Sequence, residues 1–283
     1  MKIAGVTVLF NPDEKVVSNI KSYLPELDYL FLVDNTPNQN NAKMFDFDKK
    51  IVYIANNKNL GIAEALNIGA RKAIEKKMNW LLTMDQDSAF TKNALSKMIE
   101  YAGELDKKSN VAIISPFHKT AQSSGEKKTG IEEPLVVMTS GNLVNLKAYE
   151  AVDGFKSWMF IDAVDFEFGL NLRKHGYNII QLNDAVLNHN LGNTVKKKLL
   201  GKTMYVSNHS AFRRYFIVRN RYYLYDMYHN DFPLFCDAEK GMTKHEILRV
   251  VLFEKDKIKK LKEMRRGYKD YKRGIKGGFH GEN

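Results

Sequence analysis

Cysteine is almost absent from this sequence. The 283 residues include a single one, Cys236, which excludes an internal disulfide and fits a reducing compartment. No apolar run approaches the roughly 20 residues that span a bilayer, so no membrane-spanning helix is predicted. The opening "MKIAGVTVLF" is followed at once by "NPDE", without a small-residue cleavage site. We therefore interpret it as a first strand rather than a signal peptide.

Two glycine-rich phosphate-binding motifs are also missing. No Gly-x-Gly-x-x-Gly follows a predicted strand, and no Gly-x-x-x-x-Gly-Lys-Ser/Thr occurs. Neither dinucleotide binding nor P-loop binding is therefore indicated. A calcium-binding loop after Asp85 and Asp87 is excluded as well, because Ala89 occupies the third ligand position and no glycine follows it.

Positive charge is concentrated near the C-terminus. Residues 255–276 hold 11 Lys or Arg and 3 Asp or Glu, so this segment carries 8 of the 11 net positive charges. The rest of the chain is close to neutral. A basic tail of this kind needs its own explanation, such as an anionic membrane surface or a nucleic acid.

Short apolar runs alternate with helical patterns in the first two thirds of the chain. The runs are rich in β-branched and aromatic residues, and near-continuous apolar runs are typical of strands covered on both faces of a parallel sheet. Alternating strands and helices predict an α/β domain that binds ligands at the carboxyl ends of its strands. The predicted strands are 3–10, 29–35, 51–56, 80–85, 111–116 and 134–145, and the predicted helices are 61–77, 91–105 and 162–177.

Asp85 and Asp87 follow a predicted strand in the stretch "LLTMDQDSAF". Two carboxylates at this spacing can converge on one divalent cation, and hard Mg²⁺ or Mn²⁺ prefers such oxygen ligands and leaves positions open for phosphate oxygens. A polar loop in which Asp85 caps a helix is the alternative interpretation, because an Asp-x-Asp pair is a weak motif by itself.

Several sequence motifs occur in an order that is specific to one family. Along nearly its whole length the chain resembles a family 2 glycosyltransferase of the GT-A fold, through "VTVLFNP", "VDNTPN", "NKNLGIAEALNIGARKA", "TMDQDS", "SGNLVN" and "FIDAVDFEFGLNLRKHGY". Within that family it is most similar to the bacterial rhamnosyltransferases, through "DQDS", "FIDAVDFEF", "NHNLGN" and "RRYFIVRNRYYL". The resemblance implies a mixed, mostly parallel sheet flanked by helices, with a C-terminal helical extension.

The resemblance also implies a binding site for a nucleotide sugar. Asp34, with Asn35 beside it, matches the family's base-binding aspartate, and Asn59 and Gly61 match the loop beside the nucleotide. Asp34 could instead cap its strand, and Asn59 could merely cap the following helix. Asp85 matches the carboxylate that faces ribose and metal, and Asp87 matches the direct metal ligand.

An inverting transferase needs one general base that takes the proton of the acceptor hydroxyl. Counted back from Gly176, Asp165 matches the family's base, although Val164 stands where a Glu is common. Asp162 is the second candidate and Glu167 the third; Asp162 and Asp165 share a helix face if the helix has begun at Asp162. The alternative is a solvated acidic helix start that the helix dipole stabilises.

Two further groups are candidates for contacts to the metal or the diphosphate. His189 could be a third metal ligand, although a lone histidine is often structural. Four arginines crowd one segment, where one or two guanidinium groups suit a diphosphate. They are Arg213, Arg214, Arg219 and Arg221, of which we select Arg214 and Arg219 as nucleotide-sugar contacts.

The tail is predicted to form a basic amphipathic helix. Its apolar stripe consists of Ile258, Leu261, Met264, Tyr268, Tyr271 and Ile275. Such a helix suits an anionic membrane surface. A helix packed on the body is the alternative, and nucleic-acid binding lacks a recognition motif in the body, so we expect no nucleic-acid partner.

These observations predict a GT-A domain at 1–205 and a helical segment at 206–283. We expect a Mg²⁺- or Mn²⁺-dependent, inverting transferase that moves L-rhamnose from dTDP-rhamnose to a glycan or lipid-linked acceptor in bacterial surface polysaccharide synthesis. The alternatives are a UDP-linked hexose or galactofuranose donor, and a non-catalytic module that binds a sugar nucleotide or glycan. We expect a cytoplasmic protein, peripheral on the inner face of the plasma membrane. The oligomeric state is left open.

Overall fold

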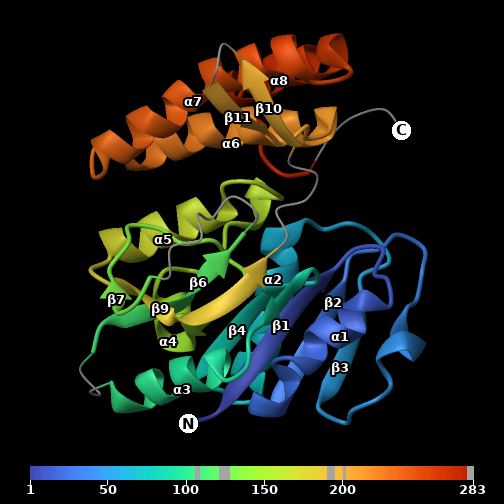
Figure 1. Cartoon of the computed structure of the whole chain (residues 1–283), viewed down its shortest axis with the longest axis vertical. Helices are drawn as coiled ribbons and strands as arrows, with labels where there is room; N and C mark the ends of the chain where they lie inside the picture. The colour runs from blue at the N-terminus through green and yellow to red at the C-terminus, as the bar shows by residue number, and fades with distance from the viewer. Residues whose placement is uncertain (106–108, 121–127, 190–194, 200–201, 279–283) are drawn as a thin grey trace. The chain divides into compact units, whose positions relative to one another are not determined.

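A computed structural model of the whole chain describes residues 1–105, 109–120, 128–189, 195–199 and 202–278. The chain divides into two compact units. One consists of Met1–Ser157 with Val164–Asn190, and the other of Trp158–Ala163 with Leu191–Asn283. The first is an α/β unit and the second is mainly helical, as the colours of Figure 1 make visible.

The α/β unit is built on a nine-stranded mixed sheet with the order β3-β2-β1-β4-β8-β6-β9-β5, in which β7 also pairs with β9. β1 to β4 run parallel, β6 and β9 run parallel to each other, and β8 joins the two groups antiparallel to β4 and β6. The strands are β1 (Ile3–Leu9), β2 (Tyr29–Asp34), β3 (Ile51–Ala55), β4 (Trp80–Asp85), β5 (Ser88–Phe90), β6 (Val111–Lys119), β7 (Ile131–Glu132), β8 (Asn142–Asn145) and β9 (Asn178–His189).

Helices cover both faces of this sheet. On one face, apolar side chains of α1 and α3 join the main core cluster. On the other face α2 comes so close to β1 that a Cβ at Gly69 would lie 2.2 Å from Cγ2 of Val6. The helices are α1 (Lys15–Lys21), α2 (Ile62–Glu75), α3 (Ala94–Glu104), α4 (Leu146–Ala151) and α5 (Val164–Lys174), with 3-10 turns at Leu24–Glu26, Ala42–Phe45 and Ser157–Met159.

The parallel strands place their carboxyl ends at one edge of the sheet. In the register of β1, Leu9 is paired with Asp34 of β2, and Val8 is paired with Asp85 of β4. Two of the predicted site carboxylates therefore end strands that lie on either side of β1. The prediction that these positions fall at strand ends is confirmed.

Some predicted bounds differ from the observed ones. Of the run 134–145 only Asn142–Asn145 is a strand. The helix expected from residue 91 begins at Ala94, and the hydroxyl of Thr91 donates to the carbonyl of Val186 of β9. The helix expected at 162–177 is Val164–Lys174, and Gly176 follows its end with a φ of 80°, the conformation that favours glycine there.

Three helices dominate the helical unit: α6 (Ala211–Tyr228), α7 (Pro233–Phe253) and α8 (Lys257–Lys272). The hydroxyl of Ser210 caps α6 by accepting from the backbone N–H of Arg213. A two-stranded antiparallel hairpin, β10 (Val195–Leu199) with β11 (Lys202–Val206), belongs to the same unit. The division therefore differs from the expected boundary at residue 205, because the hairpin groups with the helices that follow it.

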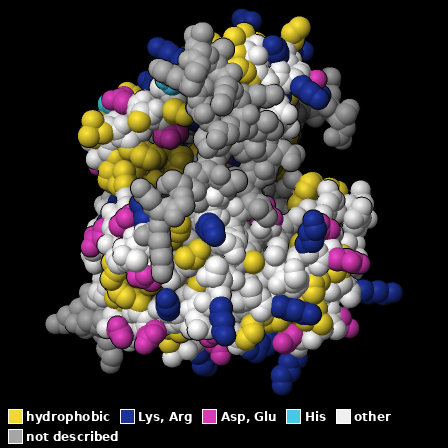
Figure 2. All heavy atoms as spheres, in the orientation of Figure 1, with side chains coloured by type: hydrophobic (Ala, Val, Ile, Leu, Met, Phe, Trp, Pro, Cys, Tyr) yellow, Lys and Arg dark blue, Asp and Glu magenta, His cyan; other side chains and the backbone are white. Residues whose placement is uncertain are grey.

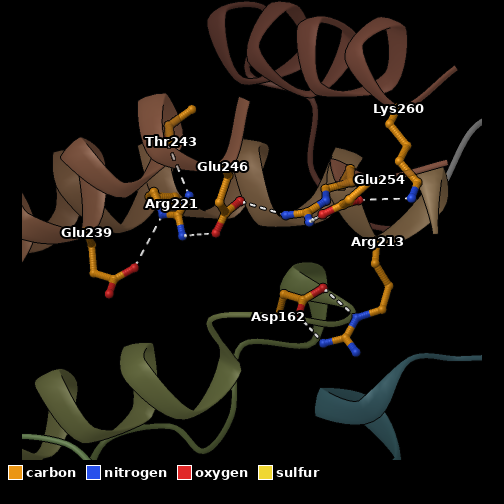
Figure 3. A network of polar contacts seen from close by, with 9 residues as sticks. Asp162, Arg213, Arg221, Glu239, Thr243, Glu246, Glu254 and Lys260 are labelled. Carbon is orange, nitrogen blue, oxygen red and sulfur yellow. Dashed lines mark hydrogen bonds and ion pairs between the residues drawn. The ribbon is translucent and has the colours of Figure 1, made fainter. Parts of the chain in front are cut away.

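A chain of buried ion pairs links the three helices (Figure 3). Arg214 of α6 contacts Glu246 of α7 at 3.1 Å and also pairs with Glu254, whose other oxygen is 2.9 Å from Nζ of Lys260. Arg221, two turns further along α6, bonds the same Glu246. Arg214 and Glu254 are almost completely buried, so each charge depends on its partners for solvation.

The apolar stripe predicted for the tail is used within the helical unit. Met264 clusters with Val218 of α6 and Val250 of α7, and Tyr271 stacks on Tyr222 with ring centroids 5.2 Å apart. A Cβ at Gly267 would lie 2.4 Å from the carbonyl oxygen of Tyr215, so α8 touches the backbone of α6. The helix is confirmed, and Met264, Gly267 and Tyr271 pack on α6, as in the alternative interpretation, whereas Ile258 in its first turn is 85% exposed. Its contact with a membrane stays a prediction. In the described part of the chain, no helix is long and apolar enough to cross a membrane.

Candidate active site

Three of the predicted ligands converge in the α/β unit. Asp85 ends β4, Asp87 lies in the turn that follows, and His189 ends β9. β5 pairs antiparallel with β9 so that Ser88 is opposite His189, which brings the histidine to the aspartates across 102 positions of sequence. One potential ligand atom from each of the three residues lies within 4.8 Å of the others. This arrangement can hold one divalent cation, with two carboxylates and an imidazole as ligands.

The orientation of the His189 ring is set by Ser88. The hydroxyl oxygen of Ser88 lies 2.6 Å from Nδ1 of His189, and the Ser88 side chain is completely buried. This contact leaves Nε2 as the nitrogen for a metal, which requires the ring proton on Nδ1, donated to Ser88. Burial lowers the pKa of His189, although the charge of Asp87 acts in the opposite direction. The ring is thus kept neutral, the form in which imidazole binds a metal.

His118 supports the same cluster and was not found by sequence reasoning. Its ring meets that of His189 edge to face at 6.1 Å, and its Nε2 lies 2.6 Å from the carbonyl oxygen of Ser140. The hydroxyl of Ser140 in turn accepts from the backbone N–H of Asp85. Burial lowers the pKa of His118 to about 4. A histidine near the end of an apolar strand, two residues after "VAIISP", was the available signal.

The turn between the two aspartates is held by Gln86. Its side-chain oxygen accepts from the backbone N–H of Phe10, and its amide donates back to the Phe10 carbonyl. The Gln86 carbonyl also accepts from the side chain of Asn19 in α1. The middle residue of "DQD" therefore ties the turn to the end of β1 and fixes the spacing of the two carboxylates.

Asp34 is buried at the end of β2 and accepts three hydrogen bonds. Its Oδ1 accepts from the backbone of Thr36, and its Oδ2 accepts from the Asn41 amide and the Tyr53 hydroxyl, each at 2.7 Å. Burial alone would raise the pKa of Asp34, but these hydrogen bonds outweigh it and hold the pKa below its ordinary value. The Asp34 carboxylate is thus kept ionised, and its hydrogen bonds hold the 36–41 loop in place. Its contact with the base of a nucleotide stays a prediction.

Asn35, Asn59 and Gly61 form one connected loop. The Asn35 amide donates to the carbonyl of Gly61 at 3.0 Å, and Oδ1 of Asn59 accepts from the N–H of Gly61 at 2.9 Å. Gly61 has a φ of 84° at the start of α2. The structure therefore brings these three predicted residues together, and Asn59 shapes the turn before α2. Their contact with a nucleotide stays a prediction.

The two candidate bases differ in their surroundings. Asp165 lies in the first turn of α5 and accepts from the backbone N–H of Phe166. Asp162 precedes the helix with a φ of 64°, so the two carboxylates do not share a helix face. Asp162 forms a two-point ion pair with Arg213 of α6. Glu167, the third candidate, is completely buried.

The turn before α5 is strained and is held by α6. Phe160, Asp162 and Ala163 all have positive φ angles, which cost energy for residues with a side chain. The amide of Asn220 donates to the carbonyls of Met159, Ile161 and Asp162, each within 2.9 Å. These bonds offset the strain and fix the segment that leads directly into Asp165.

The two selected arginines have structural partners in the helical unit. Arg219 is completely buried, and its guanidinium donates to the carbonyls of Trp158 and Gly277. Arg214 is committed to Glu246 and Glu254, as described above. Both guanidinium groups thus hold the fold of this unit, and their contact with a diphosphate stays a prediction.

Comparisons with known proteins agree with this geometry. The family model described as "Glycosyl transferase family 2" matches residues 14–146, which include Asp34, Asp85 and Asp87. The chain is 29% identical over 298 residues to the dTDP-rhamnosyl transferase RfbF of Shigella flexneri, covering 98% of this chain and 97% of that protein.

Solved structures support the same fold. TarS of S. aureus (residues 1–349), determined with UDP-GlcNAc, is 12% identical with a TM-score of 0.61, covering 100% of this chain and 94% of that one. GalNAc-T7, determined with UDP, GalNAc and Mn²⁺, is 13% identical with a TM-score of 0.56 over 71% of this chain, which spans 44% of that protein. The motifs at the strand ends, the family-model match and the fold together show a glycosyltransferase with the GT-A fold that resembles the rhamnosyltransferases of family 2.

Proposed function

We propose that the protein transfers L-rhamnose from dTDP-rhamnose, with inversion, to a glycan or lipid-linked glycan in the synthesis of a bacterial surface polysaccharide. The observation that carries this proposal is the convergence of Asp85, Asp87 and His189 at the strand ends of a GT-A fold. The similarity to a dTDP-rhamnosyl transferase, which extends over 98% of the chain, supports the choice of donor.

Asp85, Asp87 and His189 would hold Mg²⁺ or Mn²⁺. Carboxylates suit both ions, and the neutral imidazole of His189 offers a third ligand. When bound, the ion neutralises the negative charge that develops on the departing diphosphate. The backbone around the ligands is held by Gln86 and Ser140, so the ligand positions are set before the donor arrives.

Asp165 would act as the general base. In a single inverting displacement, the acceptor oxygen attacks the anomeric carbon, the bond from that carbon to the diphosphate oxygen breaks, and the hydroxyl proton passes to the base. The Asp165 carboxylate stands in the first turn of a helix, whose dipole favours its anionic form. Asp162 is the weaker candidate because Arg213 already occupies its carboxylate.

Asp34 would recognise the base of the nucleotide. A carboxylate can accept the N3–H of thymine or uracil, and Asp34 is held as an anion by its neighbours. The hydroxyl of the half-buried Tyr53, 2.7 Å from Oδ2, would be displaced or would share that oxygen. This predicts a local rearrangement of the 36–41 loop on donor binding.

A UDP-linked donor is the second candidate. TarS and GalNAc-T7, which share the fold, were determined with UDP-GlcNAc and with UDP. A UDP-hexose or UDP-galactofuranose would use the same carboxylates, because the diphosphate and the N3–H are common to both nucleotides. A non-catalytic module that binds a sugar nucleotide would keep the donor site but need no base.

A panel of donors separates these candidates. Purified protein is heated with dTDP-rhamnose, UDP-linked hexoses and UDP-galactofuranose, with and without Mn²⁺, and the unfolding midpoint is recorded. A donor at 100 times its dissociation constant stabilises the fold by about 2.7 kcal/mol. We expect dTDP-rhamnose with Mn²⁺ to give the largest shift, followed by slow donor hydrolysis. Stabilisation by a UDP-sugar alone would favour the second candidate, and binding without any turnover would favour the module.

A lipid-linked acceptor would place the protein at a membrane. We propose a cytoplasmic protein that binds the anionic inner face of the plasma membrane peripherally. The excess of 8 positive charges in residues 255–276 supports this, because Lys and Arg near an anionic surface add about 1 kcal/mol each. Sedimentation of the whole protein with anionic vesicles, weakened by salt, is the expected result.

A further inference from the structure

A row of large aliphatic side chains is exposed along the second half of α7. Its members are Ile247, Leu248, Val251 and Leu252, which are 40 to 51% exposed. Each pair four residues apart is adjacent on a helix, so the four form one continuous stripe. The buried residues of α7, Cys236, Thr243 and Val250, recur every seven residues and lie beside the stripe, next to Ile247. The α7 stripe thus borders the packed face of the helix.

A shallow groove continues this stripe. It lies between α6, α7 and α8, has a volume of about 230 Å³, and is lined by Val218, Tyr222, Ile247, Leu261 and Met264. Ile247 belongs to both the stripe and the groove. Arg265 of α8 also lines the groove, and its side chain is exposed. An apolar floor with a cation at its rim matches the chemistry of an acyl chain that bears an anionic headgroup.

The charged side chains exposed on α8 are all basic. Its two acidic residues turn inward: Asp270 is buried and accepts from the hydroxyl of Tyr215, and Glu263 is half-buried beside Arg266. The helix therefore presents cations without exposed carboxylates between them, namely Lys257, Lys259, Lys262, Arg265, Lys269 and Lys272. Figure 2 shows hydrophobic side chains among Lys and Arg at the top of the view, where Figure 1 places α7 and α8.

We propose that the α7 stripe and the adjoining groove insert into the interface of an anionic phospholipid bilayer, with the cations of α8 on its headgroups. This inference rests on the proposed membrane association. It assigns the apolar contact between the protein and the lipid to α7 instead of α8. An amphipathic surface binds through apolar burial together with electrostatic attraction. A second copy of the chain is the weaker occupant, because a symmetric contact would bring two sets of α8 cations together, whereas anionic lipid neutralises them.

Vesicle co-sedimentation of the full chain tests this surface. The vesicles are phosphatidylcholine with or without 30 mol% phosphatidylglycerol, at about 50 and 500 mM salt. The apolar variant is Leu248→Gln with Leu252→Gln. Its matched control is Leu234→Gln, which is 88% exposed on the same helix, fourteen residues before Leu248. The charge variant replaces Lys257, Lys259 and Lys262 with Gln, and its control replaces the exposed Lys49, Lys92 and Lys147 of the α/β unit.

The apolar variant is expected to lower partitioning into anionic vesicles at least tenfold at both salt concentrations, and Leu234→Gln to leave it unchanged. The charge variant should lower it about 100-fold at low salt, since three Lys each contribute about fivefold, and should approach the wild type at high salt. Neither control should change it.

Each alternative result has a defined meaning. Wild-type protein that does not sediment with anionic vesicles would overturn both this inference and the membrane association. Wild-type sedimentation that the apolar variant preserves would overturn the α7 stripe alone. A concentration-dependent dimer that the apolar variant abolishes, with partitioning unchanged, would assign the stripe to a second copy. Should the double variant fail to fold, Leu248→Trp gives an independent reading: its fluorescence must shift to the blue on anionic vesicles, and that of Leu234→Trp must not.

Discussion

The hydroxyl oxygen of Ser88 lies 2.6 Å from Nδ1 of His189, across the antiparallel pair formed by β5 and β9. The contact joins the last residue of the "DQDS" motif to a histidine 101 residues later. Because the hydroxyl occupies one ring nitrogen, the other is left to bind a metal that the two aspartates would also hold. The serine of the motif thus orients the most distant ligand of the candidate metal site.

Ser88→Ala is expected to weaken Mn²⁺ binding by roughly 10- to 100-fold, the usual effect of removing a partner that orients a metal ligand. Isothermal titration of Mn²⁺ into the protein without donor measures this directly. The control is Ser22→Ala, which removes the hydroxyl that accepts from the N–H of Phe90 on the same strand but does not touch His189. Equal losses in both variants would mean that β5 was merely disturbed.

Asp87→Ala should abolish metal-dependent donor binding and leave the fold intact. The Asp87 side chain is exposed in the turn after β4, so it contributes no core packing. Calorimetric titration of the donor with and without Mn²⁺ is the measurement, with Asp46→Ala as a control at another exposed carboxylate of the same unit. Donor affinity that survives in Asp87→Ala would exclude this residue as a metal ligand.

Asp165→Asn should lower turnover by roughly 10²- to 10⁴-fold with donor affinity nearly unchanged, because a positioned general base contributes about that much. The comparison is Asp162→Asn, which breaks the ion pair with Arg213. If Asp162→Asn alone shows the pattern of a base, the ranking of the two is reversed. A loss of donor affinity in Asp165→Asn would make that residue a donor contact.

Glu254→Gln should destabilise the helical unit by about 3–5 kcal/mol, because it leaves the buried charges of Arg214 and Lys260 without their common anion. Denaturant unfolding followed by circular dichroism measures the change. Glu75→Gln is the matched control: it breaks an exposed pair with Lys72, which contributes no more than about 1 kcal/mol. Similar losses in the two variants would show that burial does not decide the strength of the network.

The stability of the chain should depend on the protonation of His209. Burial, with the charges of Arg213, Arg214 and Lys260, lowers the pKa of His209 to about 3. The unfolded chain therefore binds the proton first, and the stabilising contribution is complete above about pH 6.5 and lost as the pH falls toward 3. Between pH 7 and 5 the expected loss is at most about 2 kcal/mol. Unfolding titrations at both pH values should show a smaller loss in His209→Gln; an identical loss would exclude His209 as its source.

Local patterns in the sequence were sufficient to predict the sheet and the first half of the site. Near-continuous apolar runs predicted the strands that β1, β2 and β4 form, and polar residues at their ends predicted where Asp34, Asp85 and Asp87 would lie. Such predictions succeed because a strand is defined by consecutive residues, and parallel strands end at one edge. The helix at Val164–Lys174 and its end at Gly176 followed from local signals in the same way.

Only the tertiary structure decided which distant residues meet. The pairing of β5 with β9 brings His189 to the aspartates, and the packing of β6 places His118 against His189. Apolar periodicity showed that one face of α8 is buried, but not that α6 covers it, because the periodicity identifies a buried face and not its partner. For the same reason the sequence indicated Arg214 as a diphosphate contact, whereas in the fold its charge is balanced by Glu246 and Glu254. Side-chain partners of this kind are set by three-dimensional packing, in which residues far apart in the sequence become neighbours.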